Sequence, residues 1–79
     1  ASLNNLAGLY KSQGRYGDAE PLLQQALELT QYLLGVEHPA VATSLNNLAL
    51  LYDSQGRYGD AEPLLQQALE LRQHLLGVE

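Results

Sequence analysis

The sequence predicts an all-α protein, an α-α superhelix built from two helix-turn-helix repeats. Two observations predict this fold. The 79-residue chain repeats with a period of 42 residues, because residues 2–37 and 44–79 differ at only four of their 36 aligned positions. Within each copy, apolar residues recur at helical spacing along one stripe. A period of about 20 to 50 residues is typical of stacked supersecondary units, each of which needs its neighbours to bury its apolar face.

The first helix of each repeat is expected over residues 2–12 and 39–54. Pro39 suits the first helical turn, where its missing N–H has no partner to lose. The apolar residues of 39–54 fall on one helical face. They are Val41, Leu45, Leu48, Ala49 and Tyr52. Gly56 follows as the expected C-terminal cap.

The second helix of each repeat is expected over residues 17–34 and 59–76. The apolar stripe of the latter consists of Ala61, Leu64, Leu65, Ala68, Leu69, Leu75 and Leu76. Asp60 lies in its first turn, where a negative charge favours the helix dipole. Pro63 is tolerated if it also lies in the first turn. If the helix begins earlier, Pro63 instead bends its start, and the sequence leaves both alternatives open.

Length and composition limit the possible classes of protein. The chain is expected to form one domain, with a first repeat over residues 1–37 and a second over 38–79. There is no cysteine, which excludes disulfides and thiolate metal sites. Nine acidic residues against four basic residues give a net charge of −5, which argues against binding nucleic acid. No apolar run approaches the ~20 residues of a membrane helix, so we expect no membrane span and, by default, a cytoplasmic protein.

The pattern of small and large residues resembles the tetratricopeptide repeat. In that family, Leu and a small residue precede an aromatic residue in the first helix, and two Ala flank a large apolar residue in the second. The matching residues are Leu6, Ala7, Tyr10, Ala19, Leu23 and Ala26, then Leu48, Ala49, Tyr52, Ala61, Leu65 and Ala68. The usual repeat of about 34 residues ends with a proline, where this chain has Gln31 and Gln73. The longer form, with HPAVATSLNNLALLY and GRYGDAEPLLQQALEL, is similar to repeats of kinesin light chain and of bacterial arrays.

The resemblance implies that the first helices line a concave groove that binds an extended peptide. The face opposite the apolar stripe supplies the candidate groove residues. They are Asn4, Asn5, Gly8, Lys11, Ser12, Thr43, Asn46, Asn47, Leu50, Asp53 and Ser54. An asparagine amide both donates and accepts hydrogen bonds, which suits it to holding a peptide main chain, and Asn5 and Asn47 match the family best. The alternative is that these asparagines only keep a solvated face polar.

No pattern in the sequence indicates catalysis or a cofactor. His38 and His74 belong to different repeats and have no second His or Cys at metal-ligand spacing, so we expect no metal site. No nucleophile–base pattern or phosphate-binding glycine-rich loop is present either. We therefore expect that the protein is not an enzyme and binds no cofactor.

Two functions remain after these exclusions. The first is a protein–protein interaction scaffold whose groove binds a peptide. The alternative is a self-associating structural array with no dedicated ligand, which the near identity of the two repeats favours. Repeat solenoids usually need about three or more units with polar caps. The last helix keeps the apolar residues Leu64, Leu71 and Leu75, so we also expect end-to-end association with other copies.

Overall fold

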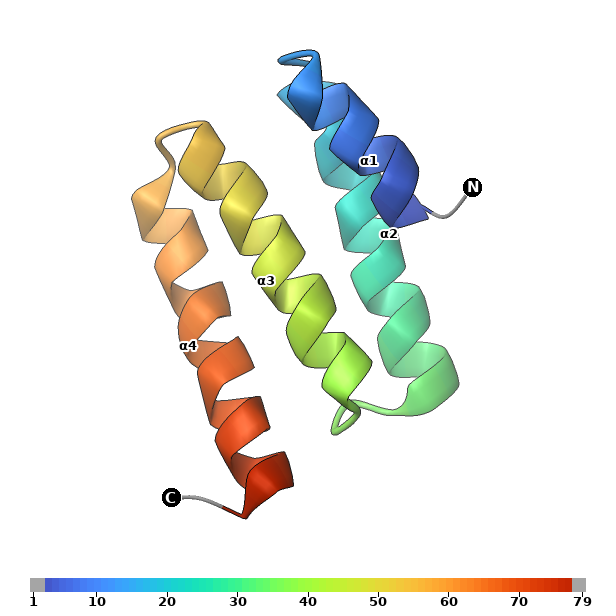
Figure 1. Cartoon of the computed structure of the whole chain (residues 1–79), viewed down its shortest axis with the longest axis vertical. Helices are drawn as coiled ribbons and strands as arrows, with labels where there is room; N and C mark the ends of the chain where they lie inside the picture. The colour runs from blue at the N-terminus through green and yellow to red at the C-terminus, as the bar shows by residue number, and fades with distance from the viewer. Residues whose placement is uncertain (1–2, 78–79) are drawn as a thin grey trace.

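The computed structural model describes residues 3–77, which form four helices arranged as two helical hairpins (Figure 1). Helices α1 and α2 span Leu3–Ser12 and Tyr16–Leu34, and helices α3 and α4 span Pro39–Ser54 and Tyr58–Leu76. The predicted all-α fold of two helix-turn-helix repeats is confirmed. Every predicted boundary within the described residues lies within one residue of the observed one, and the predicted start at residue 2 lies outside them.

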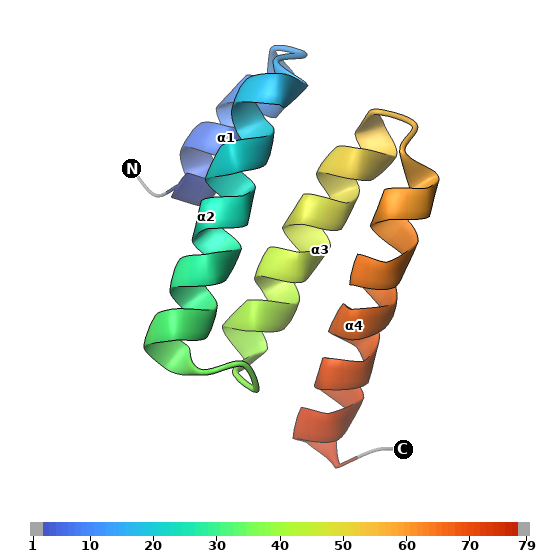
Figure 2. The ribbon, with the colours of Figure 1, turned by 180° about the vertical axis from the view of Figure 1, so that it is seen from behind.

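The helices follow one another in space as they do in the chain. Helix α3 lies between α2 and α4, and α1 packs on α2, as the two opposite views show (Figures 1 and 2). One core cluster joins all four helices through Ala7, Ala19, Leu23, Leu48, Ala49, Leu51, Tyr52 and Ala61. A second joins α3 to α4 through Val41, Ala42, Leu45 and Ala68. The buried alanines lie where helices pack, since a small side chain lets two helices approach closely.

Local interactions fix the helix ends. His38 caps α3, because its Nδ1 accepts a hydrogen bond from the backbone N–H of Ala40 at 3.0 Å. Gly14 and Gly56 both have a φ of +74°, a left-handed conformation in which a side chain would be strained. These two glycines close the turns α1–α2 and α3–α4, and the predicted cap at Gly56 is confirmed.

Pro63 lies inside α4 and not in its first turn. Because α4 begins at Tyr58, Pro63 is its sixth residue, so the first of the two alternatives for this proline is wrong. The helix nevertheless continues through it. Pro63 has no N–H for the carbonyl four residues earlier, and its ring crowds that carbonyl. The residue at that position is Gly59, whose backbone adjusts more readily than any other.

The apolar stripe of α4 is only partly buried. Ala61 and Ala68 are buried and Leu64 is half-buried. Four predicted members of the stripe, Leu65, Leu69, Leu75 and Leu76, are exposed. The reason is that, among the described helices, α4 packs mainly on α3 and no helix covers its other side. None of the four helices within residues 3–77 is both long and apolar enough to cross a membrane.

Candidate functional site

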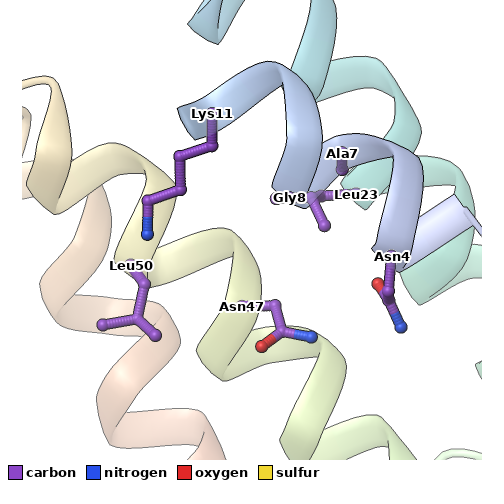
Figure 3. Close-up of a pocket in the computed structure, with 7 residues that line it drawn as sticks. All are labelled: Asn4, Ala7, Gly8, Lys11, Leu23, Asn47 and Leu50. Carbon is purple, nitrogen blue, oxygen red and sulfur yellow. The ribbon is translucent and has the colours of Figure 1, made fainter. Parts of the chain in front are cut away.

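A pocket of about 160 Å³ lies between the first helices of the two repeats, α1 and α3 (Figure 3). It is lined by Asn4, Ala7, Gly8, Lys11, Leu23, Asn47 and Leu50. The buried side chains of Ala7 and Leu23 form an apolar floor. The polar side chains come from both walls, Asn4 and Lys11 from α1 and Asn47 from α3. We call this site the α1–α3 pocket.

Five of the eleven predicted groove residues meet in the α1–α3 pocket. They are Asn4, Gly8, Lys11, Asn47 and Leu50. The other six, Asn5, Ser12, Thr43, Asn46, Asp53 and Ser54, lie on the same two helices but do not line it. Asn5 and Asn47 are counterparts in the two repeats, yet only Asn47 lines the pocket. The reason is that α3 faces α1 across the pocket, whereas no described helix precedes α1.

Three of the six residues outside the pocket bond to their own helix. Ser12 Oγ donates to the carbonyl of Gly8 at 3.0 Å, and Ser54 Oγ donates to the carbonyl of Leu50 at 2.9 Å. Thr43 Oγ1 donates to the carbonyl of Pro39 at 3.5 Å. Hydroxyls in a helix commonly bond back to the carbonyl four residues earlier. Their donors are therefore engaged, and only the hydroxyl lone pairs remain for a ligand.

Gly8 creates the space of the pocket. It stands where the second repeat has Leu50, and a Cβ added at Gly8 would meet nothing within 4 Å. The floor residues Ala7 and Leu23 are reached through this gap. In the sequence both belong to the tetratricopeptide-like pattern of small and large residues, and both are buried. Their second role, as the floor of the pocket, was not predicted. The signal for it in the sequence is that Gly8 of the first repeat aligns with Leu50 of the second.

The pocket carries one positive charge in an acidic chain. The Lys11 side chain extends from α1 toward Leu50 of α3 (Figure 3). Lys11 makes no ion pair with any residue from 3 to 77. Its counterpart in the second repeat is Asp53, which is exposed. The charge pattern therefore differs between the two repeats on this face, because the same position is basic in α1 and acidic in α3.

The two histidines lie in different settings. His38 caps α3, which the sequence reasoning did not foresee, although a histidine directly before a proline at a helix start is a visible signal. His74 Nε2 of α4 lies 3.6 Å from Glu37 Oε2 in the connection between α2 and α3, and both side chains are exposed. Among residues 3–77, no three His, Cys, Asp or Glu side chains come together as a metal site would require.

The sequence model of the tetratricopeptide repeat matches residues 1–74. The chain belongs to the tetratricopeptide repeat family. The resemblance seen in the sequence is thus confirmed at the level of the family. Tetratricopeptide repeats are generally non-catalytic scaffolds for protein interactions, and they typically bind proteins or peptides. The α1–α3 pocket lies on the face formed by the first helices of the two tetratricopeptide hairpins, which is the face predicted to line the groove.

Proposed function

We propose that this tetratricopeptide repeat protein is an interaction scaffold that binds an extended peptide across α1 and α3. The observation that supports this proposal is the α1–α3 pocket, in which Asn4 and Asn47 approach an apolar floor from opposite helices (Figure 3). Each amide has both donors and acceptors. An extended peptide backbone presents one N–H and one C=O per residue, so two amides on opposite walls suit it whatever its side chains are.

The pocket also indicates the kind of side chain that accompanies this backbone. Its floor and Leu50 are apolar, so an aliphatic side chain of the peptide is buried there. Lys11 is the pocket's one cation, and the chain carries a net charge of −5. A strongly acidic peptide is therefore disfavoured by long-range repulsion. The six predicted residues outside the pocket flank it on α1 and α3, and we include them in the path of the peptide.

The test begins with peptides selected against the intact chain from a random library. The affinity of a selected peptide is then measured by calorimetry for Asn4→Ala and Asn47→Ala. Each lost main-chain hydrogen bond is expected to cost about 0.5–1.5 kcal/mol of binding free energy. Gln25→Ala is the control, because Gln25 is an exposed amide on α2 that does not line the pocket. If both asparagine variants bind as tightly as Gln25→Ala does, the proposal fails.

The second candidate function is a structural array formed by association of copies through their ends. It is supported by apolar residues that are buried between the two repeats and exposed at the ends of the stack.

We also include in the proposal that the two repeats form one domain. We further propose, from their 42-residue period, that they are akin to the longer repeats of kinesin light chain and of bacterial arrays.

A further inference from the structure

The interface between the two repeats combines an apolar contact with two polar contacts. Leu23 of α2 and Leu51 of α3 belong to the core cluster that joins the repeats. Arg57 Nη1 donates a hydrogen bond to Glu20 Oε1 of the first repeat at 2.8 Å. Gln24 Nε2 of α2 donates to the Tyr52 hydroxyl of α3 at 3.4 Å. This interface shows how one repeat of this sequence receives the next.

The same residues are exposed where no neighbouring repeat covers them. Leu51 is 0% exposed, whereas Leu9, its counterpart in α1, is 53% exposed. At the other end of the stack, Leu23 is 6% exposed and its counterpart Leu65 in α4 is 43% exposed. The residue type is the same within each pair, and Leu23 and Leu65 also have the same flanking residues, whereas Leu9 follows Gly8 and Leu51 follows Leu50. Within residues 3–77, the difference in exposure reflects the neighbouring repeat that covers Leu23 and Leu51, and it identifies an open face at α1 and another at α4.

Arg15 at the α1 end is already held in the conformation that Arg57 adopts in the interface. Its Nε donates to Asp18 Oδ2 at 2.9 Å, as Arg57 Nε donates to Asp60 Oδ2 at 2.9 Å. Both guanidinium groups also lie 4.3 Å from the centre of a tyrosine ring, which is Tyr10 for Arg15 and Tyr52 for Arg57. Within residues 3–77, Arg15 has no glutamate partner that corresponds to Glu20.

The α4 end supplies that glutamate. Glu62 is the counterpart of Glu20, and it is exposed and forms no ion pair with any residue from 3 to 77. Gln66, the counterpart of Gln24, is also exposed on α4. The α4 end thus carries Glu62 and Gln66, the counterparts of the two α2 residues that bond across the internal interface, together with exposed Leu65. The α1 end carries the arginine and the tyrosine beside exposed Leu9.

We propose that the α4 end of one chain binds the α1 end of a second copy, with Glu62 paired to Arg15 of the next copy and Gln66 bonded to its Tyr10. The proposal deepens the second candidate function and rests on it, since it assigns the contacts that would build the array. Such a contact is head-to-tail and therefore forms open filaments and not closed dimers.

The test is sedimentation equilibrium of the intact chain over a range of concentrations, with charge-reversed variants. Arg15→Glu and Glu62→Arg each place like charges against one another in the contact. We expect each to weaken self-association by roughly five- to tenfold. An equal mixture of the two variants restores association, because Glu62 of the first then meets Arg15 of the second. The double variant restores it as well, since its reversed charges again attract each other.

Glu70→Arg is the matched control, with the same change in charge on the same helix. Its counterpart Glu28 stays exposed although the second repeat stacks on the first, so position 70 lies outside the contact. This variant should associate as the wild type does. A strictly monomeric wild type overturns both the array and this interface. Association that is unchanged by either single reversal, or that the mixture does not restore, overturns the Glu62–Arg15 contact alone.

Discussion

Arg57 binds Glu20 at 2.8 Å and thereby ties the turn before α4 to helix α2 of the preceding repeat. The same guanidinium binds Asp60 at 2.9 Å. The hydrogen bonds with Asp60 and then Glu20 raise the pKa of Arg57. A raised pKa in a base stabilises the fold at every pH below the ordinary value for arginine, and the effect is lost only above it. The arginine side of this link is therefore charged throughout the physiological range.

Replacing Arg57 by Ala should lower Tm more than replacing Arg15 by Ala. The two arginines make the same contacts with their own repeat, and only Arg57 also binds a residue of the other repeat. The difference between the two variants therefore isolates the link to Glu20. It should shrink at high salt, because both partners are partly exposed and salt screens them. Thermal melts of dilute samples provide the measurement, and equal losses in Tm would contradict this role.

Leu51→Ala should destabilise the protein far more than Leu9→Ala. Leu51 is fully buried, so its truncation should cost about 2–5 kcal/mol of unfolding free energy. Leu9 is the same residue at the same position of the other repeat, but about half of it is exposed, and the cost should be roughly 1 kcal/mol. Urea unfolding of both variants checks this, at concentrations low enough that copies do not associate. Similar costs would mean that the second repeat does not pack on the first as described.

The sequence predicted the helices well because their signals are local. Apolar spacing, Pro39 and the turn glycine Gly56 each act within a few residues, so a pattern in the chain is enough to place them. The burial of the apolar stripes was not predictable from the same pattern. Leu23 and Leu65 occupy identical sequence surroundings, yet one is buried and the other is exposed. What separates them is the next helix in space, which no local pattern contains.

The candidate site shows the same division between local and spatial information. Helical periodicity places Asn4, Asn5, Asn46 and Asn47 on the face opposite the apolar stripe, which is a local property. Which of them face each other depends on how α1 and α3 cross, and this selects Asn4 and Asn47. The role of Leu23 as part of the pocket floor also depends on packing, since it comes from α2 and is reached through the gap at Gly8.

Removing the cap of α3 should destabilise the second repeat. His38→Ala deletes the acceptor for the N–H of Ala40, with an expected cost of about 1 kcal/mol of unfolding free energy. His38→Ser should retain most of the stability, because serine supplies a capping oxygen at the same position. The comparison is made by urea unfolding near neutral pH. A serine variant as unstable as the alanine variant would show that the imidazole acts through some contact other than the cap.

Enlarging an alanine at a helix contact should be among the most damaging changes. Ala49 is fully buried in the cluster that joins all four helices. Ala49→Leu forces larger side-chain volume into that contact, at a cost of about 1–3 kcal/mol. Thr43→Leu is the control, because Thr43 lies exposed on the same helix. Circular dichroism melts distinguish the two, and a wild-type Tm for Ala49→Leu would contradict the core assignment.

Gly8→Leu should separate stability from binding. Gly8 lies inside α1 without a positive φ, and a Cβ there meets nothing within 4 Å. Replacing a glycine inside a helix by a good helix former should stabilise the protein by about 0.5–1 kcal/mol. The new side chain copies Leu50 of the second repeat but projects into the α1–α3 pocket. Peptide binding should therefore weaken in a protein that unfolds at higher urea concentration.

The contrast for this variant is Gly14→Leu, at a turn glycine with a φ of +74°. That change also meets open space, so any loss of stability reports the strained backbone and not crowding. We expect Gly14→Leu to lower the urea midpoint while the folded protein retains its affinity for a selected peptide, because Gly14 does not line the pocket. Urea unfolding should show that Gly8→Leu is the more stable of the two variants. Calorimetry should show that Gly14→Leu binds the peptide more tightly. If Gly8→Leu binds the peptide as the wild type does, the peptide does not occupy the space that Gly8 leaves open.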